Sequence, residues 1–145
     1  MYHTILVPLD GSKRAEKILS HVEILANCFS ARVILLQVIE TIQPVELDYP
    51  TDLIAETWIN EHVQQAQAYF ANLSWEYKHG KEVEILIEKG PIVQTIIRIA
   101  EREGADLIAL ASHGRTGLAR VFYGSVAAGI LHRIDRPLLI VRADE

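Results

Sequence analysis

The stretch RVILLQVI, Arg32–Ile39, indicates the fold class of this 145-residue chain. Its apolar side chains follow one another without the strict alternation that marks a strand with one face in water. A nearly continuous apolar strand is buried on both faces, as in a parallel sheet that helices cover on either side. We therefore expect an α/β protein built around a parallel sheet.

Four further apolar stretches predict the other strands, and segments with helical spacing separate them. The predicted strands are Thr4–Asp10, Arg32–Ile39, Val83–Gly90, Asp106–Ser112 and Pro137–Arg142. Apolar residues at helical intervals predict helices over Ala15–Phe29, Leu53–Tyr77, Pro91–Ala100 and Ser125–Ile134, with Ala55 to Leu73 giving the second helix its apolar face. Because strands and helices alternate throughout, we expect a single domain over residues 1–145 with right-handed crossovers.

The composition is that of an acidic globular protein. Half of the residues are apolar, 23% are charged and the net charge is −5, which argues against nucleic-acid binding through a basic surface. The apolar run near the start is too short to span a membrane or to act as a signal sequence. We therefore expect a cytoplasmic protein without membrane insertion, in which the single cysteine, Cys28, packs as an apolar side chain.

A glycine-rich stretch, ASHGRTGLARVFYGSVA, covers Ala111–Ala127 after the fourth predicted strand. Glycines allow the backbone to approach a ligand closely, and Gly124-Ser125 leads into a helix whose first N–H groups carry partial positive charge. Arg115 and Arg120 add positive charge. Because ligands of open α/β sheets lie beyond the carboxyl ends of the strands, the stretch predicts a phosphate site. The alternative is a solvent-exposed loop with Ser125 as an ordinary helix cap.

Several better-known motifs are absent from the sequence. It contains no GxxxxGK[ST], no GxGxxG after the first strand and no GxSxG. The six histidines show neither HxxxH nor HExxH spacing, so a structural zinc site is not expected. These absences argue against a P-loop NTPase, a Rossmann dinucleotide site and an α/β-hydrolase nucleophile.

Two motifs near opposite ends of the chain resemble the universal stress protein family. The first is ILVPLDGS, Ile5–Ser12, and the second is the spacing Gly-x2-Gly-x9-Gly-Ser/Thr of the family's nucleotide-binding branch. Here the second motif comprises Ala111, Gly114 and Gly124-Ser125, so alanine stands where the pattern has its first glycine. The added methyl group weakens the inference if that position needs a positive φ or direct contact with the ligand.

The resemblance implies a flavodoxin-like doubly wound sheet, of order 3-2-1-4-5 with helices on both faces, which binds ATP or another adenine nucleotide together with Mg²⁺. Pro8 and Asp10 would lie by the adenosine, and Val38 would contact the adenine. Asp10 would accept from a ribose hydroxyl or help to hold Mg²⁺, and the alternative is a plain turn residue. The other predicted ligand contacts, around the ribose and phosphates, are Ala111, Ser112, His113, Gly114, Arg115, Thr116, Gly117, Gly124, Ser125, Val126 and Ala127.

Three functions follow from these features. The first, which we favour, is a regulatory stress-response module that binds an adenine nucleotide. The second is a slow ATPase or phosphotransferase; because no nucleophile–base pair is visible, we predict no catalytic residues and at most slow hydrolysis or autophosphorylation. The third is a ligand-free interaction protein whose nucleotide site Ala111 has disabled.

The last strand predicts how the protein assembles. In the order 3-2-1-4-5 the fifth strand is an edge strand, and its sequence PLLIVR has no inward charge that would prevent pairing with another chain. Pairing with the same strand of a second copy satisfies both edges by two-fold symmetry. We therefore expect a homodimer joined through Leu138–Val141.

Overall fold

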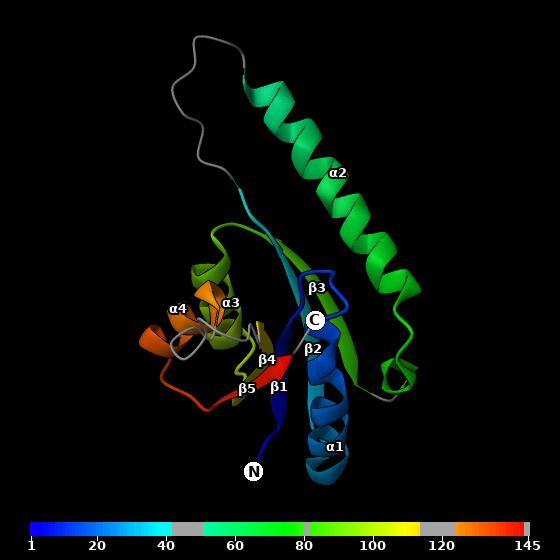
Figure 1. Cartoon of the computed structure of the whole chain (residues 1–145), viewed down its shortest axis with the longest axis vertical. Coiled ribbons are helices and arrows are strands. Elements are labelled where there is room, and N and C mark those ends of the chain that lie inside the picture. The colour runs from blue at the N-terminus through cyan, green and yellow to red at the C-terminus, as the bar shows by residue number, and fades with distance from the viewer. Residues whose placement is uncertain (42–50, 80–81, 114–123, 144–145) are drawn as a thin grey trace.

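The computed structural model describes residues 1–41, 51–79, 82–113 and 124–143. Its strands are β1 (Thr4–Pro8), β2 (Arg32–Ile39), β3 (Val83–Lys89), β4 (Leu107–His113) and β5 (Leu138–Ala143). Its α-helices are α1 (Leu19–Phe29), α2 (Thr51–Asn72), α3 (Ile92–Arg102) and α4 (Ser125–Arg133), and two 3₁₀ turns are η1 (Ala15–Ile18) and η2 (Glu76–His79). Figure 1 shows this arrangement.

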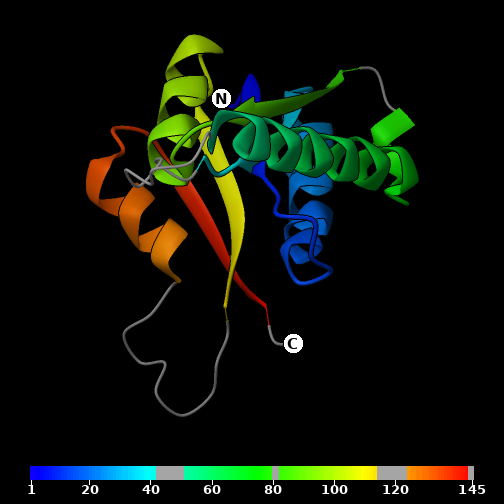
Figure 2. The ribbon, with the colours of Figure 1, turned by 90° about the horizontal axis from the view of Figure 1, so that it is seen from above.

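The five strands form one parallel sheet of order β3-β2-β1-β4-β5. This is the order 3-2-1-4-5 of a doubly wound domain, so the predicted fold class is confirmed. Seen from above, α1 and α2 lie on one side of the sheet and α3 and α4 on the other (Figure 2). The chain therefore reverses its direction of winding after β3, when it crosses back over the sheet to place β4 beside β1.

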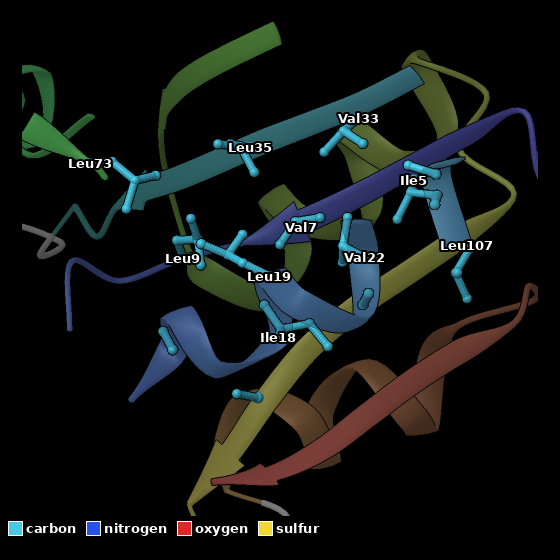
Figure 3. Close-up of a cluster of buried hydrophobic side chains, with 14 of the residues drawn as sticks. Ile5, Val7, Leu9, Ile18, Leu19, Val22, Val33, Leu35, Leu73 and Leu107 are labelled. Atoms are coloured by element: carbon cyan, nitrogen blue, oxygen red, sulfur yellow. The ribbon is translucent and has the colours of Figure 1, made fainter. Parts of the chain in front are cut away.

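The side chains of each strand alternate between two apolar layers. Ile5 and Val7 of β1 point into the layer beneath α1, where they meet Ile18, Leu19 and Val22 (Figure 3). The neighbouring Leu6 points to the opposite layer, beneath α3 and α4. Because both faces of the central strands are buried, β1 and β2 contain hardly any polar residues.

Helix α2 departs from its predicted packing in its first half. Ala66 and Phe70 are buried against the sheet, but Ala55 is exposed and Ile54 is 72% exposed. In Figure 1 the helix leans away from the sheet toward its N-terminal end. The apolar spacing correctly predicts a helix, but at its N-terminal end the helix extends beyond the sheet, so that no strand of the described part of the chain lies beneath its first turns (Figure 1).

The prediction for Cys28 is wrong, because its side chain is exposed. The buried positions of α1 are Leu19, Val22 and Ala26, which lie three and four residues apart on one face. Cys28 follows Ala26 by two residues, which rotates it about 200° around the helix axis and into solvent.

Among the described residues no helix is long and apolar enough to cross a membrane.

Candidate functional site

A cavity of about 190 Å³ opens at the carboxyl edge of the sheet, where the chain's winding reverses. Strands β1 and β4 pair only through Ile5–Leu107 and Leu6–Ile108. Beyond these pairs the two strands are no longer paired, and both Pro8 at the end of β1 and Ser112 near the end of β4 line the cavity. The cavity is lined by Pro8, Leu9, Asp10, Arg14, Ala15, Leu36, Val38, Ile92, Ile96, Leu110, Ala111, Ser112, Gly124, Ser125, Val126 and Ala127.

The structure brings most of the predicted ligand residues to this cavity. Those that line it are Pro8, Asp10, Val38, Ala111, Ser112, Gly124, Ser125, Val126 and Ala127. His113 is the last residue of β4. Gly114, Arg115, Thr116 and Gly117, together with Arg120, lie outside the described residues. The roles of all these residues toward a ligand stay predictions.

Asp10 forms the polar corner of the cavity through a tight local turn. Its Oδ1 accepts from the backbone N–H of Ser12 at 2.9 Å and from the Ser12 hydroxyl at 2.6 Å. Its Oδ2 accepts from Nη2 of Arg14 at 3.2 Å. Gly11 bridges the turn with φ +85°, a conformation that L side chains rarely adopt.

These contacts decide the charge of Asp10. Burial alone raises the pKa of its carboxyl group, but the hydrogen bonds from Ser12 and the positive charge of Arg14 outweigh that effect, so the pKa lies below its ordinary value. Asp10 is therefore an ionised acceptor at neutral pH. The Ser12 hydroxyl accepts in turn from the N–H of Ala15 at 3.1 Å, which fixes the turn to the start of η1.

Ser112 places a hydroxyl group without a partner in the cavity wall. Its side chain is 2% exposed, and its Oγ finds no hydrogen-bond partner among the described residues. Buried polar groups are nearly always paired, and an unpaired one costs about 1–3 kcal/mol. Ser112 lines the cavity, so a ligand oxygen or nitrogen that reaches this hydroxyl would satisfy it.

The N-terminus of α4 supplies backbone donors on the same wall. Gly124 is the residue that caps the helix, with φ +82°, and within the described part of the chain no side-chain hydrogen bond caps this end. Ser125 is the first helical residue, so the alternative that it serves as an ordinary helix cap is wrong. The first N–H groups of a helix lack intrahelical partners and carry partial positive charge, which suits an anionic group.

Part of the cavity lining is apolar. Val38 near the end of β2 and Ile92 and Ile96 on α3 line it. Ile92 and Ile96 are four residues apart, so both point from one helix face toward the sheet. Sequence reasoning assigned them to the core and missed them as site residues, because nothing local distinguishes an isoleucine over a cavity from one over the sheet.

Ala111 fits its strand without strain. Among the described non-glycine residues only Ser30 has a positive φ, so the position of the missing glycine is ordinary extended backbone. Ala111 pairs with Val141 in the sheet and its side chain joins the apolar layer beneath α1. Position 111 therefore does not need the backbone freedom of glycine. The methyl group of Ala111 changes the shape of the cavity.

Arg14 is another cavity residue that sequence reasoning missed. The one local signal is its place four residues after Asp10.

Among the described residues no group of three or more His, Cys, Asp or Glu side chains is placed to hold a metal ion.

Comparisons with known proteins agree with the fold and motifs. The model of the universal stress protein family matches residues 1–142. Universal stress protein MJ0577 of Methanocaldococcus jannaschii is 32% identical over 98% of this chain and 96% of its own length, and universal stress protein MJ0531 of the same organism is 29% identical over 98% and 83%.

Two solved structures are also similar. A structure of MJ0577 superposes with a TM-score of 0.82 at 31% identity, covering 100% of this chain and 99% of that one. A second, described as a universal stress protein in complex with cAMP, has a TM-score of 0.62 at 20% identity and covers 98% of each chain, which establishes likeness of fold only.

Proposed function

Because the chain belongs to the universal stress protein family, we propose that it is a nucleotide-binding member that holds ATP or another adenine nucleotide in the cavity between β1 and β4. The observation that carries the proposal is that apolar side chains form one part of the cavity lining and unpaired donors another. An adenine nucleotide has the same division, between a flat base and an anionic phosphate chain. That a protein with this fold has been solved in complex with cAMP supports a nucleotide as the ligand.

The apolar and the polar parts of the cavity lining each suit one part of the ligand. The base would lie against Val38, Ile92 and Ile96, where aliphatic side chains exclude water from its faces. The ribose hydroxyls would donate to Asp10, which is ionised. These contacts would set the orientation of the ligand.

The phosphates would meet the donors at the first turn of α4. An anionic group is favoured by the donors of this part of the site, which are Ser112 Oγ and the N–H groups of Ser125, Val126 and Ala127. We propose that Gly114, Arg115, Thr116 and Gly117 complete this half of the site, as the motif of the family's nucleotide-binding branch implies. Ala111 is compatible with binding, since its backbone is unstrained.

The proposed role is regulatory. A nucleotide that binds only the folded protein changes its stability and its affinity for partners, without any chemical step. We propose that the protein acts in the cytoplasm as a homodimer joined through Leu138–Val141 of β5. A slow ATPase or phosphotransferase remains the second candidate, and phosphate release during the binding assay would detect it.

Thermal unfolding with and without nucleotide tests the proposal. A ligand at one hundred times its dissociation constant stabilises the native state by about 2.7 kcal/mol, so saturating ATP should raise the melting temperature by several degrees. Gly124→Val should abolish the rise, because a branched side chain would stand where the phosphates approach the helix.

A matched control separates lost binding from backbone strain. Gly104 also has a positive φ, of +63°. It follows α3 near the opposite edge of the sheet, and no described atom lies within 4 Å of a Cβ added there. Gly104→Val should lower the melting temperature of the free protein yet keep the full rise with ATP. An equal rise in Gly124→Val would place the phosphates elsewhere and contradict the proposal.

A further inference from the structure

Arg14 is a charged side chain held in the cavity wall. It precedes η1, and its side chain is only 16% exposed. It lines the cavity together with Asp10, and these two are the charged residues among the described residues that do so. Long cationic side chains are mostly exposed unless a partner holds them, so this one needs an explanation.

The ion pair with Asp10 uses only a small part of the guanidinium. A guanidinium carries five N–H donors, and within the described residues the acceptor it finds is Oδ2 of Asp10, at 3.2 Å. The other N–H donors of the guanidinium are not buried, since none of its nitrogens is among the buried side-chain atoms that lack a hydrogen-bond partner. Arg14 thus presents free donors beside the cavity while Asp10 fixes its position.

The same pair makes Asp10 a poor ligand for a metal ion. Oδ1 already accepts two hydrogen bonds from Ser12, and Oδ2 faces the guanidinium. Mg²⁺ requires near-octahedral oxygen ligands at about 2.0–2.1 Å, and at Asp10 it would also lie next to the positive charge of Arg14. Repulsion between the two cations opposes a metal at this corner.

We propose that Arg14 takes the place of a metal ion at the Asp10 corner: its guanidinium binds an anionic group of the nucleotide directly, so that binding does not depend on Mg²⁺. The inference rests on the proposed nucleotide site and adds to it the residue that neutralises the ligand. Planar guanidinium donors match the oxygens of a phosphate group. The carboxylate of Asp10 orients the guanidinium and remains an acceptor for the ribose.

Isothermal titration of the full chain with ATP and with adenosine tests this. Arg14→Gln should weaken ATP binding at least tenfold, or about 1.4 kcal/mol, and should change adenosine binding less than about twofold, because adenosine has no phosphate. The matched control is Lys13→Gln, which removes the same charge one residue earlier from a side chain that is 93% exposed. It should leave both affinities unchanged. Wild-type affinity for ATP should differ less than about threefold between Mg²⁺ and EDTA.

The outcomes separate this inference from the proposed function. If the wild type binds ATP and Arg14→Gln binds it equally well, or if EDTA removes binding, the role of Arg14 is overturned and the nucleotide site stands. If the wild type binds no ATP, both fail. Arg14→Lys, which keeps the charge and loses the planar donors, serves if Arg14→Gln does not fold by circular dichroism, and it should show an intermediate loss.

Discussion

Gly129 of α4 packs directly against Val93 of α3: a Cβ on Gly129 would lie 2.8 Å from Cγ2 of Val93. This contact sets the distance between the two helices that carry Ile92, Ile96 and the first turn of α4 to the cavity. A methyl group at Gly129 would therefore push apart two walls of the proposed nucleotide site.

Gly129→Ala should destabilise the protein although alanine favours helices. The helix itself would gain about 1 kcal/mol, but Val93 is stiff about χ1 and cannot turn aside cheaply. Overpacking costs about 1–3 kcal/mol, so we expect a net loss of about 1 kcal/mol in urea unfolding. In a Val93→Ala background the same change should instead stabilise. Additive effects of the two changes would show that the helices do not touch here.

Ser112→Ala should separate binding from folding. The hydroxyl has no partner among the described residues, so its removal should leave the unfolding free energy of the free protein unchanged or slightly raised. ATP affinity should fall by about 1 kcal/mol, close to fivefold, because one hydrogen bond to the ligand is lost. Paired melting curves with and without ATP measure both quantities. A large loss of stability without ligand would mean that the hydroxyl serves the fold.

Tyr69 should make the protein sensitive to alkali. Burial and the nearby negative charge of Glu16 raise the pKa of the Tyr69 hydroxyl. The unfolded chain then loses its proton at about pH 10 while the folded protein keeps it, so unfolding is favoured as the pH rises above that value. This stabilisation is complete below pH 10 and lost above it.

Urea unfolding at pH 9 and pH 11 measures the effect. The wild type should lose more stability between these values than Tyr69→Phe, which has no proton to lose. Tyr77→Phe is the matched control, since it removes the hydroxyl group of another partly buried tyrosine. Equal losses in wild type and Tyr69→Phe would contradict the assignment.

The two edges of the sheet differ in a way that favours assembly through β5. Four consecutive apolar residues of β5, Leu138–Val141, are only half-buried, whereas β3 carries charges at Glu84, Glu88 and Lys89. Charged side chains oppose edge-to-edge pairing. Light scattering should therefore detect a dimer of the wild type at about 10–100 μM and a monomer of Ile140→Asp.

The control for the interface lies on the other edge. Ile85 of β3 is 38% exposed, and Ile85→Asp should remain dimeric. A wild-type monomer in this range, or a dimer that survives Ile140→Asp in folded protein, would contradict the β5 interface.

The strands and their order were predictable, while parts of the site were not. Buried parallel strands such as Arg32–Ile39 are marked by apolar runs, and the sheet edge where ligands lie follows from their direction. Arg14, Ile92 and Ile96 reach the cavity only through the three-dimensional path of η1 and α3. The exposed first half of α2 depends likewise on where the sheet ends, which no local pattern contains.

Titration of the purified protein with ATP by isothermal titration calorimetry is the most direct test of the central claim. We predict saturable binding of one ATP per chain, in Mg²⁺ and in EDTA alike, that Gly124→Val abolishes and Gly104→Val retains. A site with a dissociation constant of about 1 mM has a binding free energy of about −4.1 kcal/mol. If ATP up to about 1 mM gives no heat of binding, that result contradicts nucleotide binding and with it the proposed function.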